Sequence, residues 1–132
     1  MLDTKKIISQ LLFADAWVSA VVSDRIWGVA KKDYSNIASP FILYYRIASR
    51  TNYIGKRAEF FQISIWGKDS ITNEQAVNAV VNLFNRIRNQ STPDWTIKYW
   101  YIDGQTTETY DPDTELVGVH IPFAFIFNDQ NF

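Results

Sequence analysis

The hydrophobic period of the chain changes clearly between residues 60 and 89. In segment 60–67 (FFQISIWG), Phe61, Ile63 and Ile65 alternate with polar side chains, which is the period of a half-buried strand, and Gly67 ends it. Beyond this point apolar residues recur every three or four positions, which predicts an amphipathic helix of about 17 residues, roughly 25 Å long. Its apolar positions are Ala76, Val77, Val80, Val81, Phe84 and Ile87. We expect the remaining elements to supply the sheet that this helix covers.

Polar positions of the same helix predict its ends and its water-facing side. Thr72 and Gln75, three residues apart, fit a capping box at the N-terminus. Cationic residues near the other end suit the negative pole of the helix dipole. The side expected to face water holds Asn73, Glu74, Asn78, Asn82, Arg86 and Arg88.

Helical spacing also marks the N-terminal residues. Asp3 or Thr4 can cap a helix whose apolar stripe consists of Ile7, Ile8, Leu11 and Leu12. The pattern continues after a break near Asp15, which predicts a second short helix that ends before Gly28. Residues 30–40 are polar, lack a period and end in proline, so we expect a loop there.

Three further segments have the composition of strands. In 41–49 both alternating sets of residues are largely apolar. We expect the core face to be formed by Phe41, Leu43, Tyr45 and Ile47 rather than by Ile42, Tyr44 and Arg46. In 95–104, after a turn at 89–94, large rings fall on both faces. In 116–127, Pro122 removes one ladder donor, so an edge or bulged strand is expected. The shared apolar face of this last strand holds Val117, Val119, Ile121, Phe123, Phe125 and Phe127.

Composition sets limits on what the chain can do. Its 132 residues, of which 47% are hydrophobic, match the size of a single globular domain spanning residues 1–132. A net charge of -1 gives no electrostatic reason to expect duplex nucleic acid or a membrane surface as a partner. The chain has no cysteine, which excludes disulfides, thiolate metal sites and cysteine nucleophiles. We see neither a secretory signal pattern nor an apolar stretch long enough to span a bilayer.

The residues that could carry out chemistry are few and scattered. His120 is the single histidine and lies in an apolar run, where a satisfied or outward-facing side chain is expected rather than a base or metal ligand. The five glycines are too dispersed to form a phosphate loop or a dinucleotide fingerprint. We therefore expect no enzyme activity, no cofactor and no metal. The aromatic content of 16% instead suggests that some rings lie on a surface that another molecule covers.

Segment 50–57 (RTNYIGKR) crowds cationic side chains around a glycine between two strands, which predicts a long hairpin tip. A solvated turn is the simpler interpretation, but such a tip also projects far enough to reach a neighbouring subunit. The candidate interface residues are Arg50, Tyr53, Lys56 and Arg57, together with Trp100 of the 95–104 strand. Because exposed charges contribute little to folding, replacing the three cations with serine is expected to leave stability nearly unchanged.

Segment 103–115 carries five carboxylates and no basic residue, which predicts a loop or an irregular hairpin. These residues are Asp103, Glu108, Asp111, Asp113 and Glu115. Three of them imitate the start of a calcium loop, but Leu116 stands where that loop needs glycine and Pro122 where it needs glutamate. A solvated acidic loop is the simpler interpretation.

The order of elements resembles a known protein family. The N-terminal helix is followed by Ala14-Asp15-Ala16 and then by DRIW at 24–27, and a proline-led strand begins at residue 40. QISIW at 62–66 precedes a helix of AxxxVVxLF type at 76–84, and an apolar strand closes the domain. Together these features resemble the tail terminator proteins of long-tailed bacteriophages, also called tail completion or tail-to-head joining proteins.

This resemblance implies a small α+β fold, a mostly antiparallel sheet of four to five strands covered by one long helix and an N-terminal helix. It implies a homo-oligomer, a hexameric ring that caps the tail tube protein, stops its polymerisation and meets the head connector or a head-completion protein. DNA would pass through the ring without specific binding. The acidic segment would then lie toward the lumen or the upper rim, where negative walls repel DNA. The implied location is the head–tail junction of the virion, after assembly in the host cytoplasm.

Two other interpretations are open at this point. The chain could be another virion assembly protein, such as a head-completion factor or minor tail component. It could also be a small-molecule binding module that lines an apolar cavity between helix and sheet with Phe and Trp.

Overall fold

The computed structural model describes residues 3–28, 40–51, 56–88 and 95–129. Within these ranges the chain forms three helices and one six-stranded, mostly antiparallel sheet, which confirms the predicted α+β class. The helices are α1 (Thr4–Ala14), α2 (Ala16–Val22) and α3 (Ser70–Ile87). The strands are β1 (Ile26–Trp27), β2 (Phe41–Thr51), β3 (Lys56–Gly67), β4 (Trp95–Ile102), β5 (Thr107–Asp111) and β6 (Leu116–Asp129).

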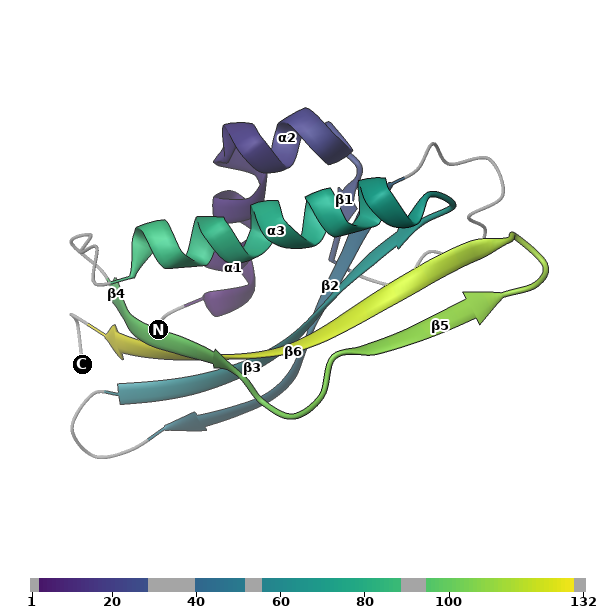
Figure 1. Cartoon of the computed structure of the whole chain (residues 1–132). Helices are drawn as coiled ribbons and strands as arrows, with labels where there is room; N and C mark the ends of the chain where they lie inside the picture. The colour runs from purple at the N-terminus through teal and green to yellow at the C-terminus, as the bar shows by residue number, and fades with distance from the viewer. Residues whose placement is uncertain (1–2, 29–39, 52–55, 89–94, 130–132) are drawn as a thin grey trace.

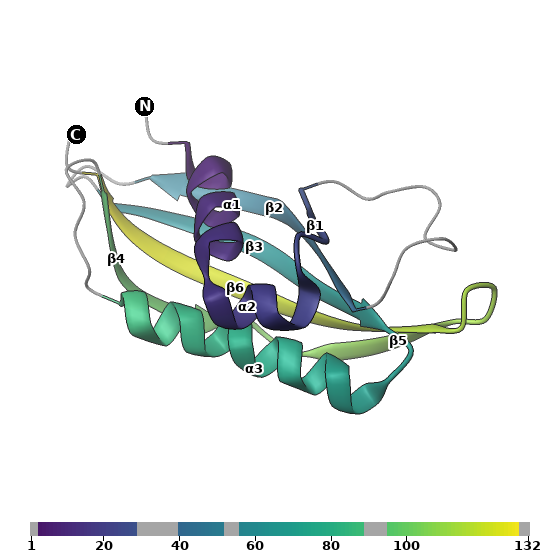
Figure 2. The ribbon, with the colours of Figure 1, turned by 90° about the horizontal axis from the view of Figure 1, so that it is seen from above.

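The strands follow the order β1-β2-β3-β6-β4, with β5 also paired to β6 (Figure 1). Among the strand pairs of the described residues, only β1–β2 is parallel. The sheet therefore has more strands than the four to five expected, because the short segments β1 and β5 both pair with longer neighbours. The β5–β6 hairpin extends from one end of the sheet in both views (Figures 1 and 2).

All three helices cover one face of the sheet, with α3 lying along it (Figures 1 and 2). The phenylalanine face of β6 packs against α3 as the alternation predicts, and Phe84 lies at the centre of this contact, with ring centroids 4.7 Å from Phe125 and 5.2 Å from Phe123. The predicted strand face of Phe61, Ile63 and Ile65 is fully buried in the same core. Within the described residues no helix is both long and apolar enough to cross a membrane.

An aspartate caps the N-terminus of each of the three helices. Asp3 caps α1, and Asp15 ends α1 and caps α2 through a 2.9 Å bond from the Val18 N–H, which confirms the break expected there. The cap of α3 was predicted wrongly. Asp69 accepts bonds from the Ile71 N–H and the Thr72 hydroxyl, so the helix begins at Ser70 and Thr72 lies inside its first turn.

The predicted core face of β2 was wrong. Ile42 and Tyr44 face the helices, while Tyr45 and Ile47 are 44% and 55% exposed on the opposite face. The beginning of β2 is buried on both faces, since Phe41 and Leu43 belong to a second small cluster with Leu116, beside Trp27 and Trp66. Alternation cannot choose a face where both faces are buried.

Asn73 was expected on the wet side of α3 but is buried. Its side-chain amide donates to the carbonyls of Gly67 and Val117, 3.1 and 3.3 Å away. These bonds satisfy backbone groups where β3 ends and β6 begins, and so join the start of α3 to the sheet.

Pro122 does not mark an edge strand, because β6 is paired along both sides. Its carbonyl accepts from the Asp103 N–H at 2.7 Å, just beyond the last residue of β4. The β4 pairing ends opposite Phe123 and the β5 pairing begins opposite His120. Proline therefore occupies the gap between two partner strands, where no ladder donor is required.

Candidate interaction surfaces

The face of the sheet away from the helices carries two rows of side chains. Directly paired residues share a face, and every second residue of β6 packs against the helices, so the residues between them lie on the opposite side. Each row crosses β2, β3, β6 and β4. The first row is Arg50, Ala58, Ile126 and Tyr99, and the second is Ala48, Phe60, Ala124 and Tyr101. We call these two rows the aromatic face.

Rings of the aromatic face are accessible. Tyr99 and Tyr101 are 50% and 42% exposed, and they stack with centroids 6.4 Å apart. Phe60 and Arg50 line a shallow depression of about 280 Å³, whose wall includes Ile47 and Asp103. The small side chains of Ala48, Ala58 and Ala124 lie between the larger side chains of the two rows. Exposed aromatic side chains on a sheet surface are typical of protein contact sites.

The β5–β6 hairpin forms a second candidate surface. Asp111 organises its turn: its carboxylate accepts from the Asp113 N–H and the Thr114 hydroxyl, both at 3.0 Å, and its carbonyl accepts from the Glu115 N–H at 2.8 Å. Glu115 has φ of 59°, the left-handed conformation that closes the turn. Asp113 and Glu115 are exposed at the tip, and Tyr110 beside them is 61% exposed.

The five carboxylates of the acidic segment do not form one loop. Asp103 follows β4 and lies near Arg50 in the depression of the aromatic face. Glu108 lies on β5, in a groove with Glu74 and Val77 of α3. The others occupy the turn of the hairpin. Of the two forms expected for 103–115, a loop or an irregular hairpin, the structure has a hairpin in which β5 pairs with β6, and its carboxylates point to separate surroundings.

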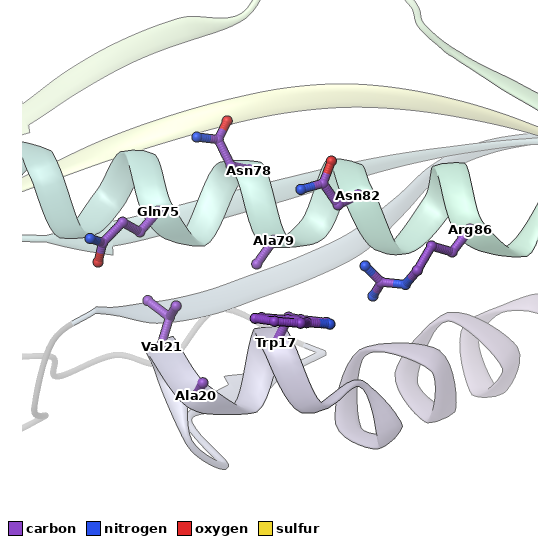
Figure 3. A pocket seen from close by; sticks show the side chains of 8 residues that line it. All are labelled: Trp17, Ala20, Val21, Gln75, Asn78, Ala79, Asn82 and Arg86. Atoms are coloured by element: carbon purple, nitrogen blue, oxygen red, sulfur yellow. The ribbon is translucent and has the colours of Figure 1, made fainter.

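A third surface is the groove between α2 and α3, of about 520 Å³ (Figure 3). Trp17 is 68% exposed and, with Ala20 and Val21, forms the α2 side of the groove. Carboxamides of α3 stand above Ala79 on the other side, and Arg86 lies at one end, paired with Asp15. The residues that α3 contributes are Gln75, Asn78, Ala79, Asn82 and Arg86.

The candidate interface residues of the β2–β3 hairpin differ in their surroundings. Arg50 and Lys56 are exposed, as expected. Arg57 is only 12% exposed and forms an ion pair with buried Glu59, so it is not a solvated tip charge. Tyr53 lies outside the described residues.

Trp100 of β4 faces the helices and packs on Phe84 and Phe123 with centroids 6.3 and 5.6 Å away. Arg88 lies over its ring, 5.4 Å from the centroid, and donates to its backbone carbonyl at 3.2 Å. Trp100 therefore joins the end of α3 to the sheet, while its neighbours Tyr99 and Tyr101 are the rings presented outward. The sequence signal for these two tyrosines was the presence of large rings on both faces of this strand.

His120 is a satisfied side chain, as the sequence predicts. Its Nδ1 lies 2.8 Å from the Ser64 hydroxyl on β3, and its Nε2 lies 2.8 Å from the Thr109 hydroxyl on β5. Its ring meets Trp66 edge to face at 5.3 Å. Burial lowers the pKa of His120 below 6.5, because the charged form is less well solvated. The imidazole thus links three strands at the base of the hairpin.

Of the comparisons with known proteins, the one with solved structures gives a match. No protein-family description and no curated protein matches the chain. Among solved structures, a chain from "Virion of native gene transfer agent (GTA) particle" has the same fold, with a TM-score of 0.65 and 12% sequence identity. The match covers 93% of this chain and 92% of that one. At this identity the likeness concerns the fold, and it extends over almost the whole of both chains.

Proposed function

We propose that this protein is a structural component of a phage-type virion, and specifically a tail terminator that joins the tail to the head. In this role it caps the tail tube protein, stops tube growth and contacts the head connector or a head-completion protein. It acts as a homo-oligomer, a hexameric ring through which DNA passes without specific binding. We assign it no reaction, cofactor or metal.

The observation that carries the proposal is the agreement between two independent likenesses. The order of sequence patterns resembles the tail terminator family, and the fold matches a chain of a gene transfer agent virion over 93% of this chain. The separate candidate surfaces are compatible with this role, because a ring subunit must meet two lateral neighbours and two axial partners.

The packing of the core argues against the small-molecule alternative. That alternative needs an apolar cavity lined by Phe and Trp between α3 and the sheet, but the phenylalanines of this region are fully buried and pack against one another. They are Phe61, Phe84, Phe123, Phe125 and Phe127. Rings at ordinary contact distances leave no room for a ligand among them.

The position of the protein in particles tests the proposal. Antibody against the chain should label one site per particle, at the head–tail junction, in the virus or prophage that encodes it. Deleting its gene should give filled heads and unattached tails of irregular length, and resupplying the wild-type chain should restore joined particles. Label along the tube, at the tail tip or over the head, or normal virions without the gene, would contradict the proposal.

A further inference from the structure

The sheet has two edges that no described strand covers along part of their length. β1 pairs with β2 only at Ile42 and Leu43, so the outer side of β2 from 44 to 51 has no strand partner among the described residues. At the opposite edge, β4 pairs with β6 on one side, and no strand in the described ranges pairs with its other side. Each edge therefore presents backbone N–H and C=O groups that a further strand can bond.

Both of these edges are hydrophobic. Of the nine large hydrophobic side chains that are exposed in the described residues, five lie on β2 and β4. β2 contributes Tyr45 and Ile47, and β4 contributes Tyr99, Tyr101 and Ile102. Residues 45–50 are all exposed, so this part of β2 is open to water on both faces of the sheet. A long exposed edge of this kind is a template for pairing with another chain.

The strand directions allow the two edges to pair with each other in separate copies. The pairs β2–β3, β3–β6 and β6–β4 are all antiparallel, so β4 runs opposite to β2. Figure 2 shows these two strands on opposite sides of β3 and β6. A second copy placed beside the first in the same orientation therefore brings its β4 antiparallel to β2, and the sheet continues without reversal of a subunit.

The two edges also lie at the same level of the sheet. Ala48 shares a row with Tyr101, through directly paired residues of β3 and β6. β1 and β5 meet the sheet at a different level, where Ile42 and Glu108 share a row. Two copies side by side therefore need no shift along the strands for β2 to meet β4.

Each edge is interrupted by one bulge, at Ile47 in β2 and at Lys98 in β4. Bulges on edge strands oppose indiscriminate pairing, because they break the regular ladder. Beyond the bulges, residues 48–51 and 99–102 are regular, and these stretches overlap in the rows of the aromatic face. The ladder available to a partner is therefore short and restricted in register.

We propose that β2 of one copy pairs with β4 of the next, through residues 48–51 and 99–102. Tyr101 then lies beside Ala48 of the neighbour, whose small side chain leaves room for the ring, and the hydrophobic side chains of both edges become covered. The contact is heterologous, because each partner uses a different edge, so successive copies form a closed ring or an open chain. The inference deepens the proposed function and rests on it only for the closure of the ring.

Cysteine cross-linking tests the contact, since the chain has no cysteine of its own. The test variant carries Ala48→Cys and Tyr101→Cys. Within one chain these positions are three strand spacings apart, about 14 Å, which is beyond the reach of a disulfide. Directly opposed residues of an antiparallel pair have Cβ atoms about 5 Å apart, which is close enough. After mild oxidation we expect a ladder of dimers, trimers and larger species on a non-reducing gel, and a single band after reduction.

The matched control carries Ala48→Cys and Thr107→Cys. Thr107 is exposed on β5, at the same side of β6 as β4 but at the level of β1. This control should give no ladder, because only the level of the second cysteine differs. A second test pair, Arg50→Cys with Tyr99→Cys, lies in the other row of the aromatic face and should cross-link as well. Far-UV circular dichroism identifies the variants that are folded.

Failure of the folded test pairs to cross-link would overturn the contact and leave both edges to strands of another protein. An equal ladder in the control would also overturn it, because cross-linking would then reflect random collision. Ladders from the test pairs alone would support it. Labelling at the head–tail junction of particles does not depend on these results, so a failure of this contact and a failure of the proposed function can be told apart.

Discussion

The guanidinium of Arg57 lies 2.7 Å from the carboxylate of Glu59, and the Glu59 side chain is completely buried. The Ser49 hydroxyl donates to the same carboxylate at 2.9 Å. A buried carboxylate is costly unless a cation and hydrogen-bond donors compensate its charge. Arg57 therefore stabilises the fold, although its position in the sequence places it among the cations of a hairpin tip.

Arg57 and Arg50 should consequently respond very differently to the same substitution. Arg57→Ser should lower the free energy of unfolding by about 3 to 5 kcal/mol, because it leaves Glu59 charged and buried without its partner. Arg50→Ser, at an exposed position, should change it by less than about 0.5 kcal/mol. Urea denaturation of both variants measures the difference. Combining Arg57→Met with Glu59→Leu should recover much of the loss, and equal stability of the two serine variants would refute this role of the ion pair.

Phe84 should contribute more to stability than an exposed apolar residue of the same helix. It lies between α3 and the phenylalanines of β6 and is fully buried. Phe84→Ala should cost about 3 to 5 kcal/mol, which approaches the whole stability of a domain of this size. Ile71, which is 68% exposed at the start of α3, provides the control. Ile71→Ala should have little effect in the same denaturation experiment, and a stable Phe84→Ala variant would mean that α3 does not cover the sheet at this point.

Elements with one buried face were predictable from the sequence, and elements buried on both faces were not. The periods of α3 and β6 are clean because helix and sheet face each other across a single core. The start of β2 is buried on both faces, by Ile42 against the helices and by Phe41 against the second cluster, so alternation gave the wrong face. Pro122 was misjudged because its place between β4 and β5 depends on where two separate partner strands end.

The candidate surfaces were predictable to a smaller degree. The acidic hairpin and the exposed Arg50 follow from local composition. The burial of Arg57 does not follow from local composition. It depends on the ion pair with Glu59, which lies two residues further along β3 on the same face, and on the elements that cover that face. The aromatic face consists of residues from four strands whose register no single segment reveals. Local patterns indicate which side chains are unusual, but strand register decides which of them meet.

The N-terminus of α3 gives a third prediction. Asp69 accepts from the Ile71 N–H at 3.0 Å and from the Thr72 hydroxyl at 2.8 Å, and these bonds lower its pKa from 3.8. Asp69→Ala should reduce the free energy of unfolding at neutral pH, because a backbone donor loses its acceptor. Asp69→Asn retains an acceptor of similar capping strength and should lose much less. Equal losses in thermal denaturation of the two variants would argue against a capping role.

His120 should make stability depend on pH in a defined direction. Its two ring nitrogens bond the hydroxyls of Ser64 and Thr109, and burial lowers its pKa in the folded state below the ordinary value of 6.5. Between the lowered pKa and 6.5 the unfolded chain binds more protons than the folded chain, so the free energy of unfolding falls as pH decreases through this window. Below the folded pKa both states are protonated and this contribution stops changing.

Urea denaturation from about pH 7.5 to about pH 5 measures this effect, since that range spans the ordinary titration of histidine. His120→Gln retains hydrogen-bonding groups without a titrating ring and should show a flatter dependence on pH, most clearly just below 6.5. Asp69 does not interfere, because its lowered pKa confines its own contribution to pH values below 3.8, where stability is lost as the carboxylate becomes protonated. The same slope in the wild type and the variant between pH 6.5 and 5 would show that His120 is not responsible, because the difference between the two curves isolates this one side chain.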